Sequence, residues 1–141
     1  ALERPEFDSF MLEYNVLKKG NAALIDAIAA SDRAVLVGTP VAQALFTGQI
    51  LDLTQARNAW ALMRALKHHR ELRTAWRYRF LNRVPGMTGP QAALAYVLRH
   101  PTISTAIFGT TAIRHLEDNI AAAELVLHPK TLEAIERQSD A

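Results

Sequence analysis

Residues 87–119 read MTGPQAALAYVLRHPTISTAIFGTTAIRHLEDN, and this stretch decides the fold. The letters TGPQ, which begin at Thr88, give the pattern of a capped helix start, with threonine at the cap, proline inside the first turn and glutamine three residues on. We expect this helix to run to His100, because the proline that follows cannot continue it. Residues 102–108 (TISTAIF) are rich in β-branched side chains and predict a strand. After a Gly-Thr-Thr turn, a second helix is expected over about 111–124.

The turn between that strand and that helix is a candidate anion site. Unpaired backbone N–H groups converge at a helix start, and the helix dipole favours negative charge there. Its residues are Gly109, Thr110 and Thr111, and Arg114 or His115 is a side chain that can reach a phosphate. From the residues alone, an ordinary helix after a strand explains the same pattern equally well.

Upstream, the pattern predicts a strand, a helix and a second strand within about 30 residues. The strands are expected over 7–15 (FDSFMLEYN) and in the apolar run AVLV at 34–37, which the Gly-Thr-Pro segment 38–40 stops. Between them, residues 21–31 have the spacing of an amphipathic helix, with Asn21 as its cap. Such a unit implies parallel strands and a right-handed crossover. Strands of a parallel sheet are expected to be buried on both faces.

Two more helical stretches are expected in the middle of the chain, one from Thr54 and one over about 70–82, before the Pro-Gly pair at 85–86. Residues 64–83 carry seven lysine and arginine side chains against one glutamate, with aromatic residues between them. This pattern fits either a nucleic-acid surface or a solvated outer helix whose aromatics enter the core. We favour the outer helix, expect no nucleic-acid partner and place Trp76 in the core.

The composition indicates one globular α/β domain over residues 1–141. Half of the residues are apolar and the net charge is only +2, which does not require a polyanionic partner. Without cysteine the chain has no disulfide framework and no thiolate metal site, and we expect no bound metal. No apolar run approaches the ~20 residues of a membrane span, so we expect no membrane partner and a cytoplasmic location.

In this order, the segments resemble the C-terminal part of the aldo/keto reductase family. The resemblance implies the last three βα units of a (β/α)8 TIM barrel, three parallel strands with surrounding helices, followed by the C-terminal helix. FDSFMLEYN is similar to the sixth barrel strand: Glu13, Tyr14 and Asn15 match, and Met11 stands where the family has a glutamine on the nicotinamide carboxamide. RAVLVGTPVAQALFTG is similar to the seventh strand, with Gly38 where many members keep an aromatic ring.

TISTAIFGTTAIRHLEDN resembles the eighth strand and its helix, where the family holds the adenosine end of NADPH. The resemblance implies the cofactor-binding part of an NAD(P)H-dependent oxidoreductase that reduces aldehydes or ketones. The residues that it assigns to adenosine and its phosphates are Gly109, Thr110, Thr111, Arg114, His115, Asp118 and Asn119. Thr39 and Pro40 would line the nicotinamide end. His115 stands where other branches have an arginine near the 2′-phosphate, so both NADP and NAD stay open.

The family's catalytic tetrad of Asp, Tyr, Lys and His comes from earlier strands and has no counterpart here. We therefore assign no catalytic residue and expect no turnover by this chain alone. The simplest interpretation is a piece of a longer enzyme. The alternative is a standalone, non-catalytic nucleotide-binding or interaction module that oligomerises. Because three parallel strands leave open edges, we expect an oligomer or association with a missing N-terminal barrel part.

Overall fold

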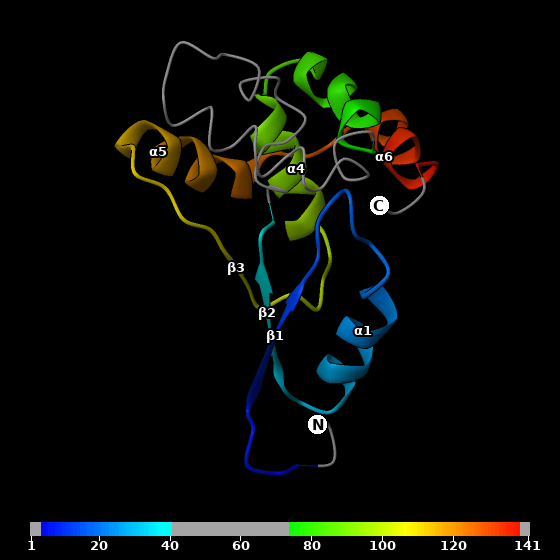
Figure 1. Cartoon of the computed structure of the whole chain (residues 1–141), viewed down its shortest axis with the longest axis vertical. Helices are drawn as coiled ribbons and strands as arrows, with labels where there is room; N and C mark the ends of the chain where they lie inside the picture. The colour runs from blue at the N-terminus through cyan, green and yellow to red at the C-terminus, as the bar shows by residue number, and fades with distance from the viewer. Residues whose placement is uncertain (1–3, 41–73, 139–141) are drawn as a thin grey trace.

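The computed structural model describes residues 4–40 and 74–138. Three parallel strands form one sheet in the order β1-β2-β3, with β1 at Ser9–Glu13, β2 at Ala34–Gly38 and β3 at Thr105–Ile107. The strands run in one direction, so their carboxyl ends share the edge of the sheet that faces α4 and α5 (Figure 1). The predicted parallel α/β arrangement is confirmed. The helix expected from Thr54 lies outside the described residues.

Helix α1 (Ala22–Ala30) connects β1 to β2 and completes the predicted βαβ unit. Its Ile25 and Ile28 are buried, and they fix the helix against the sheet. Asn21 precedes the helix, but its side chain does not cap it. The Asn21 amide instead donates to the backbone oxygen of Glu13 at 2.8 Å, so the capping prediction is wrong.

Helix α4 (Gly89–Leu98) lies at the centre of the helical layer. The predicted capping box is confirmed, because Gln91 N donates to Thr88 Oγ1 and Thr88 N donates to Gln91 Oε1. Residues 92–97 are all buried. The helix is buried on every side, and this explains why its sequence is almost wholly apolar.

The remaining elements follow the expected order with shorter bounds. The 3-10 helix η3 (Tyr78–Arg83) packs on α4, and the chain then breaks at Pro85-Gly86, where Gly86 has a φ of 77°. After β3 come α5 (Ile113–Ala121), the 3-10 helix η4 (Ala122–Glu124) and α6 (Pro129–Glu136). β3 is shorter than predicted, since the β-branched residues Thr102 and Ile103 lie before the pairing with β2 begins.

The sheet is covered on one face only by the described elements. Val35 and Val37 of β2 are fully buried, whereas Met11 of β1 is 68% exposed and Ile107 of β3 is also exposed. Figure 1 shows α1 packed beside the strands on one side, with no described helix alongside them on the other. The expectation that β1 is buried on both faces is therefore wrong, because nothing in the described structure packs on the face that carries Met11.

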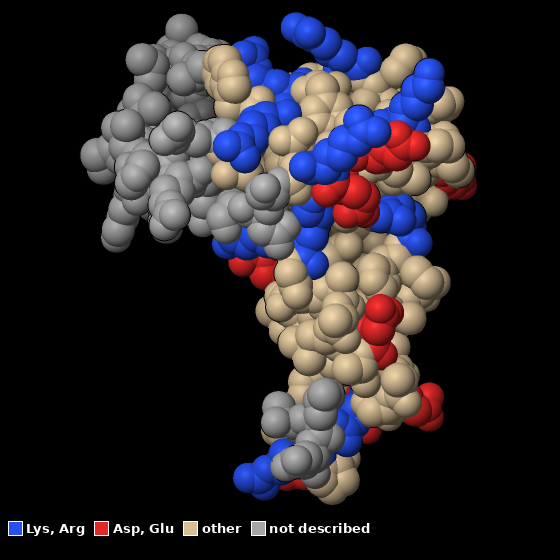
Figure 2. Space-filling view, turned by 90° about the vertical axis from the view of Figure 1, so that its right-hand side faces the viewer, with Lys and Arg blue, Asp and Glu red and all other residues tan. Residues whose placement is uncertain are grey.

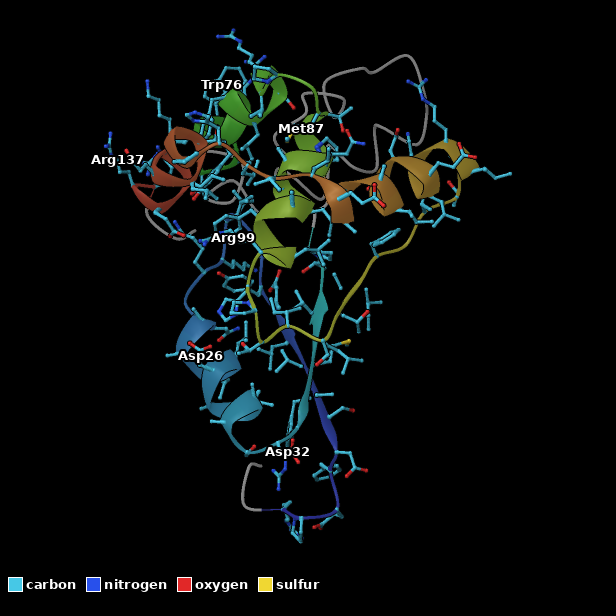
Figure 3. All side chains as sticks on the ribbon, turned by 180° about the vertical axis from the view of Figure 1, so that it is seen from behind. Asp26, Asp32, Trp76, Met87, Arg99 and Arg137 are labelled. Atoms are coloured by element: carbon cyan, nitrogen blue, oxygen red, sulfur yellow. The ribbon has the colours of Figure 1, made fainter. Side chains whose placement is uncertain are left out.

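The arginine-rich segment before α4 divides its aromatic residues between core and solvent. Tyr78 is fully buried and Phe80 packs on the core, as the outer-helix interpretation expects. Trp76 is 61% exposed, so its predicted core position is wrong. It lies at the end of the molecule away from the sheet (Figure 3), with the Arg79 guanidinium 4.1 Å from its ring centre. The cation–π contact covers part of the indole without burying it.

Lysine and arginine side chains gather over this helical end of the molecule, with a few acidic groups between them (Figure 2). Within the described residues, no helix combines the length and the apolar character required to span a bilayer.

Candidate functional site

The carboxyl edge of the sheet brings together the two predicted parts of the site. Gly38 ends β2 and is the register partner of Ile107, which ends β3. Residues 39–40 therefore leave one strand beside the point where residues 108–111 leave the next. In parallel barrels this edge is where functional residues collect. The pairing of β2 with β3 explains why two segments about 70 residues apart meet there.

Among the described residues, no side chain caps the start of α5. Ala112 stands at its cap position and supplies no side-chain acceptor. The hydroxyl of Thr110 lies 3.3 Å from both the backbone N and the backbone O of Ala112. It therefore stabilises the loop before α5 and does not cap the helix. Residues 109–111 are exposed. A Cβ at Gly109 would meet no atom of the described residues within 4 Å.

The predicted side chains of α5 occupy two neighbouring rows. Arg114 and Asp118 are four residues apart, as are His115 and Asn119, and such pairs share a helix face. Arg114 and His115 are exposed, while Asp118 and Asn119 are half-buried. Gln91 of α4 donates from Nε2 to the backbone oxygen of Asp118 at 3.0 Å. The cap of α4 thus also anchors the helix that carries the predicted adenosine contacts.

Thr39 has an unusual backbone conformation for a β-branched residue. Its φ is 52°, in the left-handed region. Its hydroxyl donates to Glu13 Oε1 at 3.1 Å, and its carbonyl oxygen accepts from Asn15 Nδ2 at 3.2 Å. Thr39 is exposed and Pro40 is buried.

Glu13 and Asn15 contact Thr39 directly, and the sequence assigned no role to either residue. Both belong to the Glu-Tyr-Asn segment 13–15, which begins at the carboxyl end of β1 and therefore lies at the same edge as Thr39. Their position at the end of a strand was the available signal. Their contacts with Thr39 depend on strand register, which the local sequence does not give.

The three tyrosines of the chain are all buried: Tyr14, Tyr78 and Tyr96. The hydroxyls of Tyr14 and Tyr96 lie 3.4 Å apart, and Tyr96 donates to Glu136 Oε1 at 3.0 Å. Burial raises the pKa of Tyr96 strongly, and the hydrogen bonds to Tyr14 and Glu136 raise it further. Carbonyl reduction with a tyrosine acid needs a hydroxyl that reaches the substrate. No tyrosine of this chain presents one.

Among the described residues, no group of three or more histidine, aspartate or glutamate side chains is placed to hold a metal ion. A shallow hollow of about 300 Å³ is lined by Trp76, Arg79, Phe80, Asn82 and Arg83. Its lining contains none of the predicted site residues.

Parallel strands in sequence order, connected by helices, are the repeating unit of an α/β barrel. The family model described as "Aldo/keto reductase family" matches residues 2–140. The chain belongs to the aldo/keto reductase family.

Solved structures give the same fold. The chain superposes on the aldo-keto reductase AKR11C1 from Bacillus halodurans (holo form) with a TM-score of 0.68 and 19% identity, covering 99% of this chain and 45% of that one. The thermostable aldo-keto reductase Tm1743, solved with the inhibitor epalrestat, gives 0.62 and 14% identity, covering 93% and 39%. The chain thus spans less than half the length of these relatives and forms a partial barrel. No curated protein sequence matched it significantly.

Proposed function

We propose that this chain is the C-terminal, cofactor-binding part of an NAD(P)H-dependent aldo/keto reductase, which reduces aldehydes or ketones. The observation that carries the proposal is the meeting of residues 39–40 and 109–111 at one carboxyl edge of the parallel sheet. A single extended dinucleotide can contact both segments. Membership of the family supports the proposed carbonyl reduction. The two segments follow different strands, which supports a dinucleotide with its adenosine end at residues 109–111 and its nicotinamide end at residues 39–40.

The residues present fit an anionic nucleotide. The first turn of α5 has backbone donors with no side-chain cap, which suits a phosphate group. Arg114 adds a fixed positive charge, and His115 adds one when it is protonated. The proposed adenosine and phosphate contacts are Gly109, Thr110, Thr111, Arg114, His115, Asp118 and Asn119. Thr39 and Pro40 would line the nicotinamide end.

The cofactor supplies the hydride, and this chain holds and orients it. Met11 stands in β1 where the family has an amide side chain, so the thioether provides no donor to a carboxamide. Both NADP and NAD remain within the proposal. The proposal keeps the expected cytoplasmic location.

This chain alone is proposed to be catalytically silent, because it carries no match to the tetrad and no exposed tyrosine hydroxyl. The carbonyl substrate then belongs to the complete enzyme. We further propose that the uncovered side of the sheet and the exposed apolar side chains of α5 are covered by an N-terminal barrel part or by another copy of the chain. Exposed Met11, Ile107, Ile113 and Ile120 support such association.

Titration of the protein with NADPH, followed by intrinsic fluorescence, tests the binding proposal. We expect a saturable change, and Asn119→Ala should weaken the apparent affinity roughly tenfold by removing a hydrogen-bonding contact. No change up to about millimolar cofactor, equal in the parent protein and in Asn119→Ala, would reject it; at that concentration only very weak binding is missed. Steady oxidation of NADPH with an added aldehyde by this chain alone would contradict the proposed catalytic silence.

A further inference from the structure

Thr39 is held in its left-handed conformation by two contacts from the end of β1. A threonine rarely adopts positive φ, because its branched Cβ crowds the backbone there. Here the φ of 52° coincides with a hydrogen bond on the hydroxyl and another on the carbonyl oxygen of the same residue. Strained residues of this kind persist when their surroundings over-determine them.

The carboxylate that accepts from Thr39 is itself fixed. Glu13 Oε1 accepts from the Thr39 hydroxyl at 3.1 Å, and Glu13 Oε2 accepts from Lys18 Nζ at 3.0 Å. The backbone oxygen of Glu13 accepts from Asn21 Nδ2 at 2.8 Å. With both carboxylate oxygens engaged, Glu13 acts as an anchored acceptor rather than as a free base.

The amide that donates to Thr39 is fixed as well. Asn15 is only 2% exposed, and its Oδ1 accepts from Leu17 N at 2.9 Å and from Lys18 N at 3.1 Å. Its backbone N and O each pair with Lys18 at 3.1 Å. Since Oδ1 is committed to these two backbone donors, Nδ2 must face the Thr39 carbonyl.

We propose that Glu13 and Asn15 are positioning residues that hold Thr39 in place and thereby set the nicotinamide end of the cofactor site. This inference rests on the proposed function, in which Thr39 and Pro40 line that end. Glu13 and Asn15 act through Thr39 and need no contact with the cofactor. Their loss should therefore affect a ligand that carries nicotinamide and spare one that carries only the adenosine end.

The test compares NADPH with 2′,5′-ADP, which lacks the nicotinamide half, on the intact chain. In Glu13→Ala we expect the Kd for NADPH to rise roughly tenfold, as for the loss of one charge-assisted hydrogen bond, with the Kd for 2′,5′-ADP unchanged. Glu13→Gln keeps an oxygen acceptor and should stay near the parent protein. The 13Cα and 13Cβ shifts of Thr39 should leave their left-handed values in Glu13→Ala and keep them in Glu13→Gln.

Each other outcome has a defined meaning. Unchanged Thr39 shifts in Glu13→Ala overturn the inference, and so does an equal loss of affinity for both ligands. If the parent protein binds neither ligand, the proposed function is rejected, and the Thr39 shifts alone then decide whether the contacts hold this residue. If Glu13→Ala does not fold, Glu13→Val removes the same carboxylate acceptor with a side chain that favours strands, and Glu13→Gln stays its matched control.

Discussion

Tyr96 illustrates how the setting of one residue determines its protonation. Burial, together with hydrogen bonds to Tyr14 and Glu136, raises the pKa of this phenol well above its ordinary value of about 10. Above that pH the unfolded chain loses this proton while the folded chain keeps it. The stabilisation is therefore complete below about pH 10 and is lost as the pH rises further.

We expect the free energy of unfolding to fall more steeply between about pH 9 and pH 11 in the parent protein than in Tyr96→Phe. Urea unfolding followed by circular dichroism at both ends of this range measures the difference. Tyr14 and Tyr78 are present in both proteins, so the difference reports on Tyr96 together with its contact to Tyr14. Equal pH slopes in the two proteins would contradict the prediction.

Core residues of α1 give a second prediction at this scale. Ile28 is fully buried, whereas Leu24 on the same helix is 43% exposed. Ile28→Ala should lower the free energy of unfolding by about 2–5 kcal/mol, because it removes buried apolar surface and leaves a cavity. Leu24→Ala should cost less than about 1 kcal/mol, since much of its surface is already in water. Chemical denaturation decides this, and similar losses in both variants would show that the burial is not as described.

At the scale of elements, the first turn of α4 both caps its own helix and contacts α5. Thr88 caps the helix, and Gln91 completes the capping box while it also donates to Asp118 of α5. Thr88→Ala should lower the free energy of unfolding by about 1 kcal/mol, and Thr88→Ser should restore most of it. Thermal or urea unfolding of both variants measures the effect; an equal loss in both would rule out the cap as its source.

The variant Gln91→Glu separates the capping of α4 from the contact with α5. The glutamate keeps an oxygen for Thr88 N but replaces the Nε2 donor with an acceptor, which faces the backbone oxygen of Asp118. We expect faster amide exchange in α5 and unchanged exchange in α4, measured by hydrogen exchange. Faster exchange in both helices, or in neither, would contradict the proposed link between the cap and α5.

Elements with local signals could be predicted from the sequence, and those that depend on distant partners could not. The cap of α4 was predictable because Thr88 and Gln91 lie within one turn. The Thr39 contacts were not, since their partners come from another strand through register. Trp76 was placed wrongly because helical spacing gives the faces of a helix but does not say which face meets the core.

At the scale of the whole molecule, the described elements cover only one of the two faces of the sheet. Parallel strands are stable when both faces are covered, and here one face and two edges are open in the described structure. The relatives of the same fold are more than twice as long as the part that matches this chain. We expect the part of the barrel that those relatives have and this chain lacks to cover this face. The order of segments in the sequence already indicated an incomplete barrel.

The exposed apolar side chains of α5 allow the expected association to be measured. None of its residues is buried, and its apolar residues Ile113, Leu116 and Ile120 recur at helical spacing on one face. We expect the parent chain to sediment as a dimer or larger species, because water-exposed apolar surface of this kind favours association. The double variant Ile113→Lys, Ile120→Lys should shift it towards a monomer. Val126→Lys changes a residue that is 88% exposed outside this helix, and it should sediment as the parent does. A monomeric parent at micromolar concentration, or equal shifts in both variants, would refute the proposal that this face is an association surface.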